Sequence, residues 1–133
     1  MNLWDTAGEE TYHSLQHGFF RDSDGGAAGG CVAARDAHHP TRAVFIVYDA
    51  LRAASFAAID KWASDIEAHC PGAVLVLLGN KVDVPSGRAV SREEGEAAAA
   101  RHGALHFEVS AKSGANVEAA FVAMMAALLA RER

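Results

Sequence analysis

The sequence predicts an α/β protein with a doubly wound, mostly parallel sheet. Short apolar runs of strand length alternate along the chain with segments whose apolar residues recur at helical spacing. Such alternation implies right-handed crossovers, which put helices on both faces of a parallel sheet. Half of the 133 residues are apolar and only three are proline, a composition typical of one compact domain.

The first elements are a short apolar strand over Met1–Asp5 and, after a glycine-containing turn, a helix-like segment over Glu9–Arg21. The stretch Asp22–Arg42 is rich in Gly and Ala and has no period, which predicts an irregular surface loop. The β-branched and aromatic run Val44–Tyr48 predicts a strand that is buried on both faces of the sheet.

The later elements alternate in the same way. They are a helix over Ser55–Ala68 that Cys70, Pro71 and Gly72 end, a strand over Ala73–Leu78, a helix from about Ser91 to His102, a strand over Leu105–Val109, and a helix over Val117–Arg131. Ser91 and Glu94 have the spacing of a capping box, which fixes where the second of these helices begins.

Charge and cysteine content exclude several function classes. The formal net charge is −5 and the twelve basic residues are scattered, so nothing favours nucleic acid or a charge-driven membrane contact. Cys31 and Cys70 form no CxxC pair, and the sequence has no signal peptide and no apolar run of about 18 residues. A reducing, intracellular compartment is therefore expected.

Polar motifs follow three of the predicted strands. In an open α/β sheet, ligands bind beyond the carboxyl ends of the strands. The motifs there are Asp5-Thr6-Ala7-Gly8, Asn80-Lys81-Val82-Asp83 and Ser110-Ala111-Lys112. Each alone is a common polar turn at the end of a strand, but the three together, in this order, are specific.

The segments WDTAGEE, YHSL, VYD, GNKVD and EVSAKSGANVEAAF resemble the Rab family of small GTPases in the Ras superfamily, and YHSL and FFRDSDG look most like its endosomal members. The resemblance covers nearly the whole chain apart from an irregular insertion at about residues 26–43. It implies that residues 1–133 are the C-terminal part of a small GTPase domain with the P-loop NTPase fold. The implied function is GTP binding and hydrolysis, as a molecular switch in vesicle trafficking, with guanine nucleotides, Rab regulators and Rab effectors as partners.

The resemblance also implies a role for each motif residue. Asp5 would hold Mg²⁺ through a water, and the Gly8 amide would bind the γ-phosphate of GTP. Asp83 would accept two hydrogen bonds from guanine, a pattern that adenine cannot offer. The aliphatic stem of Lys81 would cover the base, and Asn80 would brace the neighbouring loops.

In the third motif, the Ala111 amide would meet the guanine oxygen, while Ser110 and Lys112 would fix that loop. Glu9 stands where most relatives have the Gln that orients the attacking water. A carboxylate there cannot donate to a γ-phosphate oxygen and adds negative charge, so we expect slow hydrolysis. The alternative is that a partner supplies the catalytic groups and Glu9 is tolerated.

The phosphate half of such a site has no counterpart in the sequence. In the family, the first strand, the G-x-x-x-x-G-K-[ST] loop and the Mg²⁺-binding switch segment precede the DTAG strand, and this sequence contains no such loop. Because that loop provides most of the attraction for the β-phosphate, we expect weak nucleotide binding. No Cys follows Cys70, so contact with an endosomal or vesicle membrane would need a prenylated tail from outside this sequence.

Two hypotheses therefore remain open: a fragment of a working Rab-like GTPase, and a non-catalytic Rab-like remnant that binds regulators or effectors. An unrelated doubly wound protein, such as a dehydrogenase or response regulator, is disfavoured because the sequence has no GxGxxG. Cys31, His38 and His39 are three candidate metal ligands on a loop without a fourth, too few for a closed zinc site.

The missing strand predicts a folding defect. In the family it lies between the MNLWD and VFIVY strands, so its absence would leave a gap of roughly 10 Å with unpaired strand edges on both sides. We expect the purified chain to be poorly folded or prone to aggregate, measured by thermal unfolding. A sharp, cooperative melt would contradict this expectation.

Overall fold

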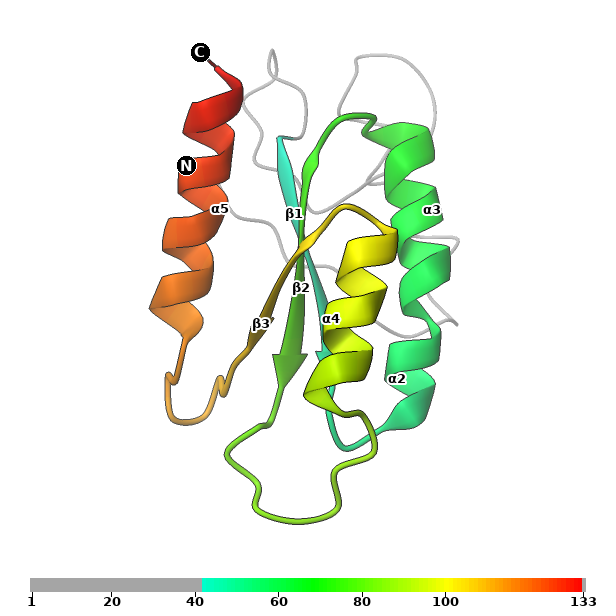
Figure 1. Cartoon of the computed structure of the whole chain (residues 1–133), viewed down its shortest axis with the longest axis vertical. Coiled ribbons are helices and arrows are strands. Elements are labelled where there is room, and N and C mark those ends of the chain that lie inside the picture. Colours follow the sequence, from blue (N-terminus) through cyan, green and yellow to red (C-terminus); the bar gives the residue numbers. More distant parts are fainter. Residues whose placement is uncertain (1–41, 133) are drawn as a thin grey trace. The chain divides into compact units, whose positions relative to one another are not determined.

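The computed structural model describes residues 42–132 (Figure 1). The elements expected over Met1–Asp5 and Glu9–Arg21 lie outside this range, as does nearly all of the insertion expected at about 26–43. The chain divides into two compact units: residues 1–44 with 64–73, and residues 45–63 with 74–133. Each unit is considered on its own.

The larger unit is built on a three-stranded sheet with the order β1-β2-β3. β1 is Ala43–Asp49, β2 is Val74–Asn80 and β3 is Leu105–Glu108. β2 and β3 pair in parallel, from Val76 beside Leu105 to Gly79 beside Glu108. β2 is the central strand and the most buried of the three, because helices pack against both of its faces.

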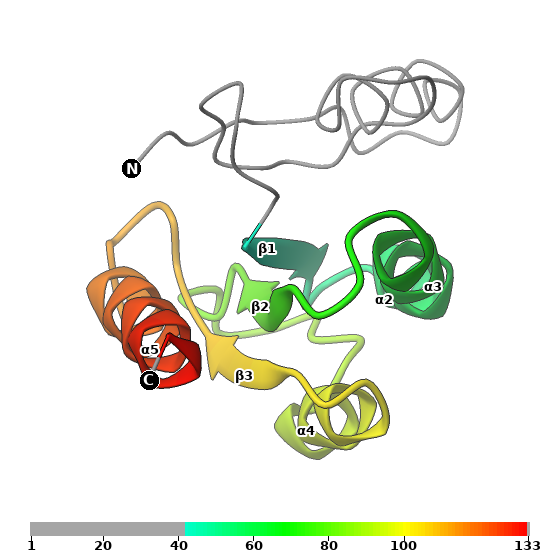
Figure 2. The same ribbon diagram turned by 90° about the horizontal axis from the view of Figure 1, so that it is seen from above.

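Helices cover both faces of this sheet (Figure 2). α5 (Val117–Arg131) lies on one face, whereas α2 (Ala53–Ala57) and α4 (Arg92–Arg101) lie on the other. On the α5 side, the Phe45 and Phe121 rings pack with their centroids 4.8 Å apart. The predicted α/β class, with a parallel sheet between helices, is confirmed.

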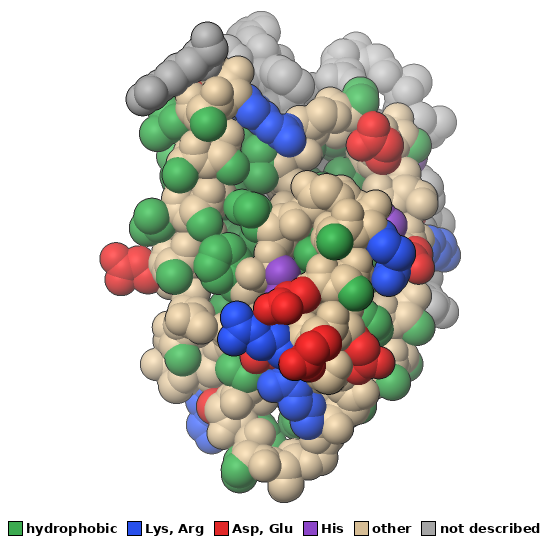
Figure 3. Space-filling view, viewed as in Figure 1, with side chains coloured by type: hydrophobic (Ala, Val, Ile, Leu, Met, Phe, Trp, Pro, Cys, Tyr) green, Lys and Arg blue, Asp and Glu red, His purple; other side chains and the backbone are tan. Residues whose placement is uncertain are grey.

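Charge is unevenly distributed over these helices. Acidic and basic side chains gather over α4, whereas hydrophobic side chains gather over α5 (Figure 3). On α4, Arg92 Nε donates to Glu96 Oε1 at 2.8 Å, one turn away. On α5, the apolar residues Val122, Met125 and Leu129 are exposed.

In the smaller unit, the described residues are 42–44 and 64–73, which include the second half of α3 (Ile59–His69). Ile66 and Cys70 are buried, and the Cys70 amide donates to the Ile66 carbonyl. After the helix, the Ala73 amide donates to the Cys70 carbonyl and closes a turn in which Gly72 has φ +79°, a left-handed conformation that glycine adopts at low cost because it has no Cβ. The predicted helix stop at Cys70, Pro71 and Gly72 is confirmed.

The capping box before α4 is also confirmed. The Ser91 hydroxyl accepts from the Glu94 amide at 3.1 Å, and the Glu94 carboxylate accepts from the Ser91 amide at 2.7 Å. These two bonds satisfy N–H groups that the start of a helix leaves unpaired. α5 has the bounds expected from the sequence.

Two expectations were wrong. The single helix expected over Ser55–Ala68 is two helices, α2 and α3, separated at Ala58, because the Ala58 amide turns back to the Phe56 carbonyl instead of continuing the α-helical ladder. β1 is not buried on both faces: Val47 is 59% exposed. Phe45 lies on the same face of β1 and packs on Phe121 of α5, so α5 covers that face at Phe45 and leaves Val47 exposed.

A tightly packed pair, Tyr48 on β1 and His106 on β3, reaches toward α4. The Tyr48 hydroxyl and His106 Nε2 form a hydrogen bond of 2.9 Å. Burial raises the pKa of Tyr48 and lowers the pKa of His106, so both stay uncharged at neutral pH. A Cβ on Gly95 would collide with both side chains, and a Cβ on Gly79 would lie 2.6 Å from the Tyr48 hydroxyl oxygen.

This packing predicts that Gly95→Ala destabilises the protein. Alanine favours a helix by about 1 kcal/mol over glycine, but overpacking a filled site typically costs about 1–3 kcal/mol. We therefore expect a lower urea midpoint for the loss of the helical circular dichroism signal. Ala97→Gly, at an exposed position of the same helix, is the control, since it changes helix propensity alone. A higher midpoint for Gly95→Ala would contradict the close approach.

Candidate functional site

The loops that follow β1, β2 and β3 lie at the same end of the sheet (Figure 1). Backbone hydrogen bonds tie them together: the Ala50 amide donates to the Asn80 carbonyl at 3.0 Å, and the Val82 amide donates to the Val109 carbonyl at 3.4 Å. The second and third predicted motifs are therefore adjacent in space, although about thirty residues of sequence separate them.

Ser110, on the loop after β3, forms a hydrogen bond with Asp83 on the loop after β2. Its side chain is fully buried, and its hydroxyl donates to Asp83 Oδ1 at 2.7 Å. The same hydroxyl oxygen accepts from the Ser113 amide at 3.1 Å. Asp83 itself is exposed, so its carboxylate is held at one oxygen by Ser110 while the residue stays open to solvent.

The loop that carries Ser110 is closed on itself before α5 begins. The Gly114 amide donates to the Ser110 carbonyl at 2.8 Å, and the Ser110 amide donates to the Ala115 carbonyl at 3.1 Å. Asn116 is left-handed, with φ +59°, and its Nδ2 donates to the Glu108 carbonyl at 2.9 Å. Asn tolerates this conformation better than most residues do, and the bond anchors the loop to β3.

Asn80 connects all three loops. Its side-chain Oδ1 accepts from the Ala111 amide at 3.0 Å, while its carbonyl accepts from the Ala50 amide. The resemblance assigns the Ala111 N–H to a guanine oxygen, but here that N–H is engaged by Asn80. A base could receive it only if the bond to Asn80 were shared or released.

Lys81 has an unusual backbone and a charged partner. It is left-handed, with φ +69°, which is uncommon for a residue with a Cβ and is characteristic of functional sites. Its ammonium contacts Asp49 Oδ2 at 2.7 Å. Analysis of the sequence missed Asp49 as a site residue, although it directly follows the strand expected over Val44–Tyr48, the same signal that identified Asn80 and Ser110.

The surroundings of the Asp49 carboxylate favour its ionised form. Partial burial raises its pKa, but the hydrogen bonds from Lys81 and from the Leu51 amide lower it by more, so the pKa lies below its ordinary value. The carboxylate is therefore charged at neutral pH. The ion pair is lost only as the pH falls through this lowered pKa.

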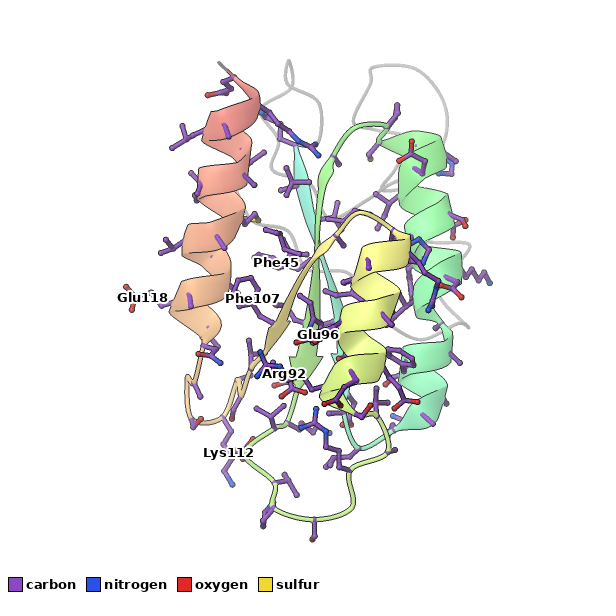
Figure 4. The ribbon with its side chains drawn as sticks, viewed as in Figure 1. Phe45, Arg92, Glu96, Phe107, Lys112 and Glu118 are labelled. Atoms are coloured by element: carbon purple, nitrogen blue, oxygen red, sulfur yellow. The ribbon has the colours of Figure 1, made fainter. Side chains whose placement is uncertain are left out.

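Other predicted site residues are less constrained or lie elsewhere. Lys112 is exposed on the loop that follows β3, at the same end of the sheet (Figure 4). Asp5, Gly8 and Glu9 lie outside the described residues, as do the candidate metal ligands Cys31, His38 and His39. Residues 42–132 contain no cluster of three or more His, Cys, Asp or Glu that could hold a metal ion. No helix in this range is long and apolar enough to cross a membrane.

The chain is similar in sequence to known proteins of one family. Residues 32–130 match the profile of the Ras family. The chain is 39% identical over 125 residues to Ras-related protein Rab-26 of Bos taurus and 38% identical to Ras-related protein Rab-26 of Rattus norvegicus. Each alignment covers 93% of this chain and 42% of the relative, so the chain spans less than half the length of the relatives it matches.

The support under Asp83 yields a prediction. Ser110→Ala removes the donor to Asp83 and leaves the Ser113 amide without its acceptor. Because a hydrogen bond to a charged group contributes about 1.5–3 kcal/mol, we expect amide hydrogen exchange in residues 110–114 to become roughly tenfold faster or more. Ser86→Ala, on the exposed part of the loop after β2, is the control. Unchanged exchange in the Ser110→Ala variant would show that this bond does not order the loop.

Proposed function

Because this chain belongs to the Ras family of small GTPases, as a Rab-type member, we propose that it binds guanine nucleotides and that residues 42–132 supply the guanine-reading half of the site. Members of this family bind GTP and GDP together with Mg²⁺. The proposal rests above all on one observation: the Asp83 carboxylate is oriented by a fully buried Ser110 hydroxyl, while Asp83 stays open to solvent.

Guanine suits this carboxylate. Its ring N–H and exocyclic amine are two adjacent donors, and a carboxylate accepts such a pair side by side. Adenine presents a ring nitrogen acceptor where guanine has the N–H, so it would leave the carboxylate unpaired. An unpaired charge at a partly desolvated site is costly, and Asp83 thereby discriminates between the two bases.

The neighbouring residues complete the base site. The aliphatic stem of Lys81 is half exposed beside Asp83 and offers an apolar surface for one face of a purine. Asn80 keeps the loops after β2 and β3 together through its bond to the Ala111 amide. On binding, the Ala111 N–H would turn from Asn80 toward the guanine oxygen, while Lys112 would support the same loop.

The phosphates of the nucleotide would be bound by residues outside 42–132. By resemblance, Asp5 would hold Mg²⁺ through a water, and the Gly8 amide would donate to the γ-phosphate. The metal would supply charge neutralisation at the phosphates. Glu9 stands at the position that orients the attacking water, and its charge would make GTP hydrolysis slow.

The wider role follows from the family alone. We propose a molecular switch in vesicle trafficking that binds Rab regulators and effectors, inside the cell, and meets a membrane through a lipidated tail beyond this segment. The second candidate is a binding module that does not hydrolyse GTP. The carboxylate at Glu9 favours it over an efficient enzyme.

Asp83→Asn tests the base-reading role. An Asn has one acceptor oxygen: it can accept from the ring N–H while its Nδ2 donates to the second oxygen of xanthine, but with guanine that Nδ2 faces the exocyclic amine, another donor. We expect guanosine diphosphate to bind at least tenfold more weakly and xanthosine diphosphate to bind more tightly than in the parent, because a hydrogen bond to a charge contributes about 1.5–3 kcal/mol. The measurement is a titration of fluorescent analogues of both nucleotides, carried into the millimolar range.

Glu93→Gln is the matched control, since it makes the same acid-to-amide change on the exposed surface of α4. It should leave both affinities unchanged. An Asp83→Asn variant that binds both nucleotides as the parent does, or loses both equally, would rule out Asp83 as the residue that reads the base.

A further inference from the structure

Asp49 and Lys81 form an ion pair across the ends of two neighbouring strands. Asp49 is the last residue of β1, and Lys81 follows the last residue of β2. Lys81 Nζ lies 2.7 Å from Asp49 Oδ2. The Lys81 side chain is 52% exposed, whereas that of Asp49 is 15% exposed. The carboxylate is therefore mostly enclosed, and the lysine reaches over the surface to meet it.

The carboxylate is fixed through both of its oxygens. While Oδ2 binds Lys81, Oδ1 accepts from the Leu51 amide at 2.9 Å. The backbone of Asp49 is held as well, because its amide donates to the Ser55 hydroxyl at 2.9 Å. That hydroxyl in turn donates to the Arg52 carbonyl at 2.7 Å. These bonds hold Asp49, at the end of β1, to the turn at Leu51 and to Ser55 of α2, without any ligand.

Lys81, in contrast, would be mobile without this partner. A lysine side chain has four rotatable bonds, and the loss of their rotamer entropy opposes its ordering. The left-handed backbone at φ +69° fixes where the side chain leaves the loop. The contact with Asp49 fixes where it ends. Between these two points, the aliphatic stem is held in one direction along the carboxyl end of the sheet, where Asp83 also lies.

We propose that Asp49 is a positioning residue for guanine binding: it anchors the Lys81 ammonium so that the lysine stem is a preorganised platform for the base. The inference rests on the proposed function of this site. Asp49 acts through Lys81 and does not contact the base. A platform that is ordered in advance lowers the entropy lost on binding, so its removal weakens affinity without removing a ligand contact.

The competing explanation is an ordinary surface ion pair. Such pairs contribute little to stability, and salt screens them. An ordinary pair would leave nucleotide affinity unchanged when it is broken. A positioning role makes the opposite prediction, because the effect of Asp49 on affinity must then pass through Lys81.

A double-mutant cycle tests the proposal on the full chain. Asp49→Asn keeps an oxygen that can accept from Leu51 but loses the charge that holds Lys81. Lys81→Met keeps an aliphatic stem but loses the ammonium. We expect each variant to raise the dissociation constant for fluorescent guanosine diphosphate by about threefold to tenfold, and the double variant to be no weaker than either single one.

The control is Asp60→Asn, which removes another ion-paired carboxylate, bound to Arg101 and His102 at the C-terminal end of α4. It should leave the affinity unchanged. A second readout is ionic strength: the difference between the parent and Asp49→Asn should shrink as salt is raised, because screening weakens the anchor in the parent.

The failure of this inference can be separated from the failure of the proposed function. If Asp83→Asn shifts the base preference but Asp49→Asn and Lys81→Met act additively, Asp49 does not work through Lys81 and the inference is overturned. If Asp49→Asn loses its circular dichroism signal, Lys81→Met decides, since it leaves the Leu51 and Ser55 bonds of Asp49 intact. Parent-like affinity in Lys81→Met overturns the anchored platform. If Asp83→Asn leaves base preference unchanged, the proposed function itself fails.

Discussion

β2 and β3 pair in parallel from Val76 and Leu105 to Gly79 and Glu108, and one further bond continues the pairing, from the Val109 amide to the Gly79 carbonyl at 2.8 Å. Everything at the carboxyl end of the sheet depends on this register. It brings the second residue after β3, Ser110, level with the turn after β2, so that the Ser110 hydroxyl donates to Asp83. A slip of one residue would turn Ser110 to the other face of the sheet and leave the Asp83 carboxylate without support.

The same register requires close packing on the α4 face. His106, in the middle of β3, reaches the Tyr48 hydroxyl of β1 across β2. This is possible only because β2 has Gly79, and α4 has Gly95, where side chains would otherwise collide. The two glycines therefore let three strands and a helix approach closely enough to fix the sheet. The loops that carry Asn80, Lys81 and Ser110 depend on this frame for their positions.

Local signals in the sequence were sufficient for the elements and for much of the site. The capping box at Ser91 and the apolar stripe of α5 determine those helices through contacts within a few residues. The pairing of Asp49 with Lys81 could not be predicted, because it depends on β1 lying beside β2, a long-range fact. The exposure of Val47 depends in the same way on how far α5 extends over the face of β1 that carries Phe45. The break at Ala58 has no local signal, since alanine is the best helix former.

The central claim is that the loops after β2 and β3 form one guanine-reading surface. The most direct measurement is a pair of ¹H–¹⁵N NMR titrations of the chain, one with guanosine diphosphate and one with adenosine diphosphate. The account predicts that the guanine nucleotide shifts the amides of residues 80–83 and 110–112, including Ala111 as it leaves Asn80, and that the adenine nucleotide does not. Equal shifts with both nucleotides, or shifts confined to other parts of the chain, would contradict it.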